Sequence, residues 1–453
     1  MATTSFHCEL AWLSGETPAR DVLVEANQGR IVTVTPDATP PPDATRLHGI
    51  VLPGLANAHS HAFHRALRSR TQTATGTFWT WREEMYRLAA ALDPDSYHRL
   101  ARATFAEMVL AGVTCVGEFH YLHHAPGGER YGDPNELGGA MIAAATEAGL
   151  RITLLDACYL GSGIDPDGGL RPAEGTQLRF SDGTAEAWTH RVAALRPDGA
   201  HARVGAAIHS VRALDPDAMS DVARWAEQHG AVLHAHVSEQ VAENEQCHHA
   251  YSRSPLGLLC DLGVLTERFT AVHATHVTEH DVSLLATASS SVCMCPTTER
   301  DLADGIGPTA GFRDAGVVMC LGSDSHAVID LFEEARAVEL DERLASGLRG
   351  THRIVDLLAA ATANGHRTLG WPEAGVIAPG APADLVAVDL RSRRTAGAAS
   401  GDALAAVVYA ATAGDVTDVV VSGRHVVCDR RHCSIDVARE LEASIDAVWQ
   451  AAS

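Results

Sequence analysis

Lysine is absent from this chain of 453 residues, and its 35 basic residues are all arginine. The absence excludes mechanisms that need a lysine Schiff base, a lysine in a phosphate-binding loop, or a carbamylated lysine that bridges two metal ions. An arginine guanidinium is a planar fork that binds a carboxylate in a bidentate way, whereas lysine is a flexible point charge. Where a carboxylate must be gripped, we therefore expect arginine to do it.

Cysteine motifs of the C-x-x-C type are also absent, although the chain has ten cysteines. Thiolate sites of the zinc-finger and cytidine-deaminase types are therefore unsupported. Cys293 and Cys295 flank Met294 in an apolar run, and we expect them to be core residues of a strand. The scattered cysteines, the lack of a basic and apolar leader, and the lack of a membrane-length apolar stretch favour a reducing cytoplasm.

Positive charge is scarce, because the formal net charge is −22 at pH 7. This balance disfavours nucleic acid and anionic membranes as partners. It also means that an anionic substrate needs cations placed locally. With 46% hydrophobic residues, the chain is long enough to bury the core of a barrel and an additional domain.

Eight short apolar runs, separated by segments of helical periodicity, occupy the chain from Val51 to about Trp371. Parallel strands need crossover connections and are buried on both faces, so this alternation predicts an α/β fold with a (β/α)8 TIM-like barrel. The runs are VLPGLANAHSH, VTCVGEFH, RITLLDACY, ARVGAAIHS, AVLHAHVSE, FTAVHATHV, SVCMCPTTE and VVMCLGSDS.

Both ends of the chain have the alternating pattern of β structure. DVLVEANQGRIVTVTPD predicts a hairpin, and GVIAPGAPADLVAVDL and VTDVVVSGRHVVCD predict short strands that pair with it. We expect residues 1–50 and 376–433 to form one small composite β domain, residues 51–375 to form the barrel, and residues 434–453 to form a helix. The charged run FEEARAVELDER predicts a solvated helix face with intrahelical ion pairs.

Five residues at the ends of the apolar runs are candidates for a metal centre. A barrel gathers its catalytic groups at the carboxyl ends of its strands. A single H-x-H pair is commonly incidental, since a strand places alternate side chains on one face. For any one of the 25 histidines, a satisfied core or surface residue is the alternative. Such residues at successive strand ends favour a mononuclear metallohydrolase, and they are His59, His61, His236, His273 and Asp324.

Taken together, these motifs make the chain resemble the amidohydrolase superfamily, and more closely the formimidoylglutamate deiminases of histidine degradation. The wider resemblance depends on the metal constellation, and the narrower one depends on arginine and tyrosine motifs. It extends over almost the whole chain. Its markers are HSHAFHRALR, TFWTWREEMY, GEFHYLHH, HSVRAL, HVSEQ, VHATH, CPTTERDLADG and GSDSHAVIDLFEEARAVELDERL.

The resemblance implies one divalent metal ion per chain, zinc or alternatively Fe2+, bound by His59, His61, His236 and Asp324. His236 is preferred to His234 on the same strand face, because the family pattern has a histidine three residues before a glutamate. Such an ion lowers the pKa of its water to roughly 7 and so supplies hydroxide at neutral pH.

The glutamate of that pattern, Glu239, is implied as the general acid and base. It would protonate the imino nitrogen and pass a proton to the leaving amine, which typically contributes about 10²- to 10⁴-fold in rate. An exposed loop glutamate is the alternative. His273 would hydrogen bond to the water or to the tetrahedral centre, and Asp324 would also accept the water proton. His276, three residues beyond His273, is expected to be structural.

Loop residues after the first, second and fourth runs are implied as substrate contacts. In the resembled family, the matching residues bind the two carboxylates of the glutamyl group. Each charged hydrogen bond of this kind contributes about 1.5 to 3 kcal/mol. Many relatives have glutamine at one of the positions, His64. The residues are His64, Arg82, Tyr121, His209 and Arg212.

The alternative for the two arginines is a surface ion pair with a neighbouring carboxylate, and Arg82 stands beside Glu83 and Glu84. Overall, the sequence and its resemblance predict zinc-dependent deimination of N-formimidoyl-L-glutamate to N-formyl-L-glutamate and ammonia. The resemblance also suggests a homodimer. One rival is a ring aminohydrolase of the same fold that acts on guanine or an adenosine derivative, which Trp79 and Trp81 would suit. Another is a non-catalytic barrel that serves as an assembly subunit.

Overall fold

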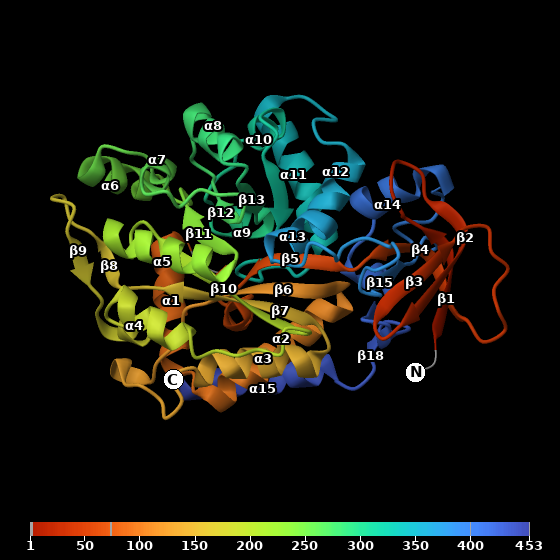
Figure 1. Ribbon diagram of the computed structural model, residues 1–453, viewed down its shortest axis with the longest axis horizontal. Coiled ribbons are helices and arrows are strands. Elements are labelled where there is room, and N and C mark those ends of the chain that lie inside the picture. Colours follow the sequence, from red (N-terminus) through yellow and green to blue (C-terminus); the bar gives the residue numbers. More distant parts are fainter. Residues whose placement is uncertain (1–2, 73–74, 399, 453) are drawn as a thin grey trace.

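Eight parallel strands form a ring at the centre of the computed structural model, which describes residues 3–72, 75–398 and 400–452 (Figure 1). Each strand hydrogen bonds to the next one in the chain, and each lies within one of the eight predicted runs, so the predicted barrel is confirmed. The strands are β5 (Leu55–Ser60), β6 (Val113–His120), β7 (Arg151–Cys158), β10 (Ala202–Ser210), β11 (Leu233–Val237), β12 (Phe269–His273), β13 (Ser291–Met294) and β14 (Val318–Leu321).

The ring closes where β14 meets β5. Ser60 pairs with Asp324 in parallel fashion, and the backbone N–H of Asp324 donates to the carbonyl of His59 at 3.0 Å. The two backbones approach so closely that a Cβ atom at Gly322 would lie 2.7 Å from the Cβ atom of His59. Glycine is therefore required at this position, and the seam brings the first and the eighth strand ends together.

Helices connect the strands and cover the outside of the ring (Figure 1). The predicted helix before β6 begins at Pro94, because Asp93 accepts a hydrogen bond of 2.7 Å from the backbone N–H of Ser96 and proline suits a first helical position. The helices of the barrel are α1 (Phe78–Ala91), α2 (Pro94–Leu110), α3 (Glu136–Ala148), α4 (Ala185–Val192), α5 (Pro216–His229), α6 (Val241–Tyr251), α7 (Pro255–Asp261), α8 (Glu279–Thr287), α9 (Pro296–Asp301), α10 (Thr309–Asp314), α11 (Leu331–Ser346), α12 (Ile354–Ala359) and α13 (Gly365–Thr368). A short hairpin, β8 (Gly161–Ile164) with β9 (Leu170–Pro172), projects after β7.

A second sheet combines the two ends of the chain, as the sequence predicted, and its red and blue strands lie side by side in Figure 1. Its order is β18-β17-β16-β15-β4-β1-β2-β3, and buried Phe6, Val22 and Leu385 contribute to its core. The strands are β1 (Thr4–Ala11), β2 (Ala19–Asn27), β3 (Arg30–Thr35), β4 (Thr45–Pro53), β15 (Leu385–Val388), β16 (Val416–Val421), β17 (Arg424–Cys428) and β18 (Arg431–His432).

One predicted strand proves to be two. The run VLPGLANAHSH is divided at Gly54, where the chain leaves β4 in the second sheet and enters β5 in the barrel. A Cβ atom at Gly54 would lie 2.2 Å from Oγ1 of Thr114, so the glycine lets the two sheets meet at this point. Arg151 and Asp384 join the same two sheets through a buried ion pair.

The helical prediction for the chain end is confirmed by α15 (Val437–Ala451), which packs against α2, while α14 (Ala403–Tyr409) precedes β16. The solvated face predicted for FEEARAVELDER is wrong in part. Within α11, Glu339 does pair with Arg343 at 2.7 Å, but its carboxylate is buried and accepts from the backbone N–H groups of Gly350 and His352. None of the helices among the described residues combines the length and the apolar character needed to cross a membrane.

Candidate metal centre and active site

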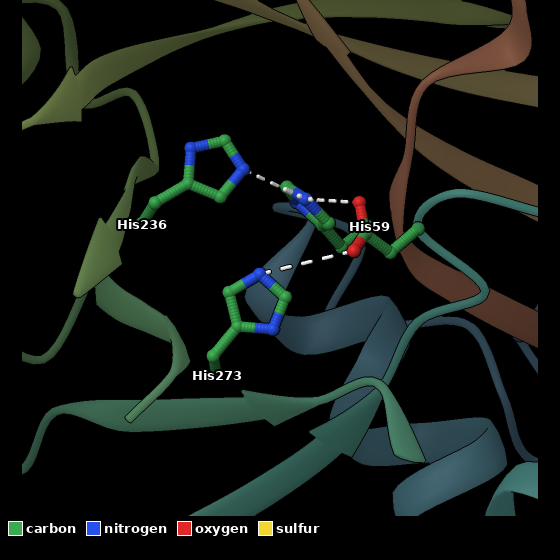
Figure 2. A group of neighbouring side chains, drawn as sticks. His59, His236 and His273 are labelled. Atoms are coloured by element: carbon green, nitrogen blue, oxygen red, sulfur yellow. Dashed lines mark hydrogen bonds and ion pairs between the residues drawn. The ribbon is translucent and has the colours of Figure 1, made fainter. Parts of the chain in front are cut away.

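Imidazoles from several strand ends converge on the carboxylate of Asp324. Nε2 of His59 and Nε2 of His61 each lie 3.3 Å from Oδ1 of Asp324. Nε2 of His236 lies 3.2 Å from Nε2 of His59. Figure 2 shows the rings of His59, His236 and His273 turned toward one another, and the donor atoms of these three and Asp324 all lie within 4.8 Å of one another.

Backbone carbonyls fix the orientation of two of these rings. Nδ1 of His236 lies 2.8 Å from the carbonyl oxygen of His209, and Nδ1 of His61 lies 3.0 Å from that of Phe119. A carbonyl only accepts hydrogen bonds, so Nδ1 carries the proton in each ring and Nε2 keeps its lone pair. Partners of this kind commonly orient histidines that bind a metal.

The donor set suits a divalent cation. Burial lowers the pKa of His59, His61 and His236, which keeps these imidazoles neutral. Burial opposes ionisation of Asp324, but its hydrogen bond to His59 and the charges of the nearby histidines outweigh it and hold its pKa below the usual range. Neutral imidazoles with one carboxylate are ligands that zinc and iron accept. Within the described part of the chain, Nδ1 of His59 and Nε2 of His273 are buried without a hydrogen-bond partner.

Glu239 lies beside this cluster, just beyond β11. Oε1 of Glu239 is 3.9 Å from Nε2 of His273, which in turn is 3.8 Å from Oδ2 of Asp324. Burial raises the pKa of Glu239 to about 7, against the opposing charges of His273 and Arg212. Burial lowers the pKa of His273, but Glu239 and the other carboxylates outweigh it and raise the value to about 10. The carboxyl group of Glu239 can therefore exchange protons near neutral pH.

Backbone strain marks the same strand ends. Ser238, His273 and Asp324 have positive φ angles of 53°, 69° and 42°. Such conformations cost non-glycine residues about 1 to 3 kcal/mol each, and they cluster at functional sites. These three backbone conformations lie at the strand ends that carry Glu239 and the metal-ligand candidates.

A cavity of about 60 Å³ opens beside the cluster, and each of the five predicted substrate contacts lines it, together with Glu239 and Asp324. His64 is buried, and its Nε2 lies 2.8 Å from the hydroxyl of Tyr121. Aromatic side chains that the sequence did not single out complete the wall. They are Phe78, Tyr86, Tyr159 and Phe180, whereas Trp81 had been considered only for a rival function.

The two arginines of the cavity have different surroundings. Arg212 is largely buried, with 11% of its side chain exposed, and its Nε lies 3.1 Å from Oε2 of Glu243 and a terminal nitrogen 3.9 Å from Glu239. The sequence left a surface ion pair open as the alternative for this arginine. The ion pair with Glu243 is present, but it lies in the wall of the cavity and not on the surface. The guanidinium of Arg82 lies 4.6 Å from the ring centre of Trp79, while Glu84 pairs with Arg87 at 3.3 Å.

Other buried carboxylates of the site were missed from sequence. Glu299 accepts from the backbone N–H of Cys295 at 2.9 Å and lies 3.4 Å from Nδ1 of His273. Glu118 accepts from the Ser60 hydroxyl at 2.6 Å and from the backbone N–H of Ala62 at 2.7 Å. The available signal was their place in the predicted runs, since Glu118 lies in GEFH near the end of β6 and Glu299 lies in CPTTE, in the helix α9 that follows β13.

The remaining candidate histidines lie elsewhere. Nε2 of His234 is 3.0 Å from the carbonyl of Thr368, and Nε2 of His276 is 2.8 Å from that of Asp304. A larger cavity of about 1190 Å³ lies at the opposite end of the barrel, where Ala202, Thr270 and other strand starts line it. It contains none of the predicted site residues, so size alone does not identify the site.

Comparisons with known proteins agree with this geometry. Residues 50–426 match the Amidohydrolase family. The chain is 37% identical over 428 residues to a formimidoylglutamate deiminase of Pseudomonas aeruginosa, covering 91% of this chain and 92% of the relative. It is 30% identical over 430 residues to a 5-methylthioadenosine/S-adenosylhomocysteine deaminase of Natronomonas pharaonis, covering 93% and 92%. The crystal structure of an amidohydrolase from Brucella melitensis superposes with a TM-score of 0.90 at 31% identity, covering 98% of this chain and 100% of that one.

Proposed function

The chain belongs to the amidohydrolase family, and from this premise we propose that it hydrolyses N-formimidoyl-L-glutamate to N-formyl-L-glutamate and ammonia. One observation carries the proposal. A single cavity holds the histidine and aspartate cluster with Glu239 at one side and two guanidinium groups, Arg82 and Arg212, in its wall. A linear amidine that carries two carboxylates needs the cluster with Glu239 for the reaction at its amidine carbon and the two guanidinium groups to bind its carboxylates.

The proposed metal ligands are His59, His61, His236 and Asp324. Their neutral imidazoles and single carboxylate favour zinc, with Fe2+ as the alternative. When bound, such an ion supplies hydroxide at neutral pH by lowering the pKa of a water to about 7. The absence of lysine from the chain removes a carbamylated bridge for a second ion at this centre and supports a mononuclear site.

Proton transfer is assigned to Glu239. Its buried carboxyl has a raised pKa near neutrality, so it can take a proton from the attacking water and give it to the departing nitrogen. His273, held by Glu299, faces the same space through Nε2 and would donate a hydrogen bond to the tetrahedral carbon's new oxygen. Asp324 would act as a second acceptor for the water proton.

Substrate orientation is assigned to the opposite wall. The Nε atom of Arg212 is occupied by Glu243, which leaves its terminal nitrogens for a carboxylate of the substrate. Arg82 contributes a second guanidinium, and Tyr121, His64 and His209 add neutral donors. Charge-assisted hydrogen bonds are worth about 1.5 to 3 kcal/mol each, enough to hold a dianion in an acidic protein.

A ring aminohydrolase is the second candidate. The aromatic wall and the relative that deaminates adenosine derivatives favour it. Ammonia release from a panel of formimidoylglutamate, formimidoylaspartate, guanine and adenosine derivatives tests the two. We expect the highest kcat/KM for formimidoylglutamate, and a preference for guanine or an adenosine derivative would replace the deiminase assignment. The same panel addresses the non-catalytic alternative, which predicts no turnover at all. The homodimer is tested by measuring the mass of the protein in solution.

A further inference from the structure

Among the described residues, two groups of possible metal ligands lie outside the active site. In the first, His120, His123 and Asp156 are buried together between barrel and helices. The carboxylate of Asp156, however, accepts two hydrogen bonds of 2.8 Å from Arg191 and one of 2.9 Å from Trp188. Its charge is already balanced by the guanidinium, so this group has no need of a cation.

The second group lies at the edge of the composite sheet and has no such cation within it. Donor atoms of Asp418, His425 and Cys428 lie within 4.8 Å of one another. Nε2 of His425 is 3.1 Å from Oδ1 of Asp418. Sγ of Cys433 is 3.4 Å from Sγ of Cys428. Three grouped donors thus come from β16 and β17, and Cys433, the residue that follows β18, approaches the group from the side of Cys428 without lying within 4.8 Å of the Asp418 and His425 donors.

Strand pairing explains why these residues meet. β16 and β17 are antiparallel neighbours, with Val420 opposite His425. β17 and β18 form a hairpin in which Cys428 is opposite Arg431, and the backbone N–H of Cys433 donates to the carbonyl of Val426 at 2.8 Å. The sequence that brings the thiols together is H-x-x-C-x-x-x-x-C, which differs from the C-x-x-C spacing considered above.

The hairpin turn itself is strained. Its two central residues, Asp429 and Arg430, have φ angles of +48° and +63°. A two-residue turn of this type favours asparagine, aspartate and glycine, so Asp429 suits it, whereas the left-handed conformation costs Arg430 roughly 1 to 2 kcal/mol. The chain therefore accepts an unfavourable turn at the point that sets the two thiols side by side.

The distances suit a metal better than a disulfide. A tetrahedral zinc ion with bonds of about 2.3 Å to sulfur separates two sulfurs by roughly 3.7 Å, and bonds of about 2.0 to 2.1 Å separate a nitrogen and an oxygen by roughly 3.3 Å. The observed separations of 3.4 Å and 3.1 Å are close to these values. A disulfide joins its sulfurs at about 2.05 Å.

The neighbouring histidine is excluded as a ligand. Nε2 of His432 lies 2.9 Å from the carbonyl of Ala148 at the end of α3, and its Nδ1 accepts from the backbone N–H groups of Ser434 and Ile435 at 3.3 and 3.2 Å. Both ring nitrogens are occupied. This ring anchors the hairpin to the barrel and leaves the outward side to the four donors.

We propose that Asp418, His425, Cys428 and Cys433 bind a zinc ion in a closed structural site, separate from the catalytic centre. The donors of Asp418, His425 and Cys428 already form a group, and a shift of the Cys433 side chain would add its thiolate as the fourth ligand and leave no open position for chemistry. The site fastens the edge strand β18 to β16 and β17. The chain continues from this hairpin into α15, whose Trp449 donates to the carbonyl of Ala66 at 2.8 Å.

The test is metal analysis of the full chain purified without chelator, with zinc supplied. We expect two zinc ions per chain in the wild type and one in Cys428→Ser and Cys433→Ser. Both variants should keep ammonia release and show a lower melting temperature. The matched control is Cys260→Ser, a partly exposed cysteine in α7, which should keep two ions. A second ion that persists in the double variant Cys428→Ser/Cys433→Ser would overturn the proposal.

Thiol reactivity provides a measurement that needs no variant. In the zinc-loaded wild type, Cys428 and Cys433 should resist a thiol reagent until a chelator is added, and cobalt in place of zinc should give thiolate charge-transfer absorption. Thiols that react freely in the presence of zinc contradict the proposal. Thiols that are released only by a reductant, in a protein lighter by two hydrogens, identify a disulfide and contradict it as well.

Discussion

Nδ1 of His236 lies 2.8 Å from the backbone carbonyl of His209, so a residue of the substrate wall orients a proposed metal ligand through its main chain. The contact does not depend on the His209 side chain. We therefore expect His209→Ala to keep the full metal content while kcat/KM for formimidoylglutamate falls by about tenfold, the loss of one hydrogen bond to a charged group. Metal content and kinetics are measured on the same preparation.

His236→Ala is the paired variant, because it removes the ring and leaves the backbone. It should lose the catalytic metal and the activity together. If His209→Ala also loses metal, the side chain of His209 does more than line the cavity, and the separation of the two roles would be wrong.

Glu239→Gln separates chemistry from binding. The amide keeps the shape of the side chain but cannot shuttle a proton, so we expect kcat to fall by at least about 10²-fold while fold and metal content are unchanged. Steady-state ammonia release and metal analysis provide the measurement. Near-normal turnover in this variant would remove Glu239 from the mechanism.

Arg82→Met tests the specificity of the substrate wall. The guanidinium of Arg82 lies over the rings of Trp79 and Tyr86, and no carboxylate among the described residues forms an ion pair with it. Its loss therefore leaves no buried acid unpaired. We expect kcat/KM for formimidoylglutamate to fall more than about tenfold, since a charged hydrogen bond exceeds about 1.4 kcal/mol. An uncharged amidine should be affected much less.

Arg268→Met is the matched control for that variant, because Arg268 is exposed at the opposite end of the barrel. It should leave kcat/KM unchanged for both substrates. Equal losses on charged and uncharged substrates in Arg82→Met would mean that the arginine maintains the site and does not recognise carboxylates.

Asp384→Asn tests the ion pair between the two sheets. Arg151 would be left as a buried, unpaired charge. We therefore expect the free energy of unfolding at pH 7 to fall by about 3 to 5 kcal/mol. Burial opposes ionisation of Asp384, but Arg151 outweighs it and holds the pKa of the carboxyl below its usual range. Urea unfolding measures the loss, and Asp446→Asn on the exposed face of α15 controls for the change of charge.

The pH dependence of this effect has a defined sign. A carboxyl with a lowered pKa in the folded protein stabilises it above the unfolded value of about 3.9, and the contribution is lost as pH falls through the folded pKa. The stability difference between wild type and Asp384→Asn should therefore be largest near neutrality and shrink in acid. A difference that grows as the pH falls below about 4 would contradict the assignment.

Strand ends could be predicted from the sequence because they depend on local pattern. Apolar runs and intervening helical periods located all eight barrel strands, and the polar residues at their ends included His59, His236 and Asp324. The same patterns placed both chain ends in one sheet. Each of these features is determined by residues that are close together in the sequence.

Contacts between distant segments could not be predicted in this way. The carbonyl of Phe119 that orients His61 carries no side-chain signal, and Glu339 looks like a surface residue until the backbone N–H groups of Gly350 and His352 are placed against it. The division at Gly54 likewise depends on Thr114 in another strand. Each case needs the three-dimensional neighbour to be known.

The seam between β5 and β14 makes the order of chain synthesis matter. His59 and His61 are made early, whereas Asp324 emerges only after seven further barrel strands have been translated. In the second sheet, β4 likewise waits for β15 before it has a neighbour on both sides. A nascent or truncated chain thus has imidazoles without their carboxylate and an unprotected strand edge. Appearance of activity during translation would report that the barrel has closed.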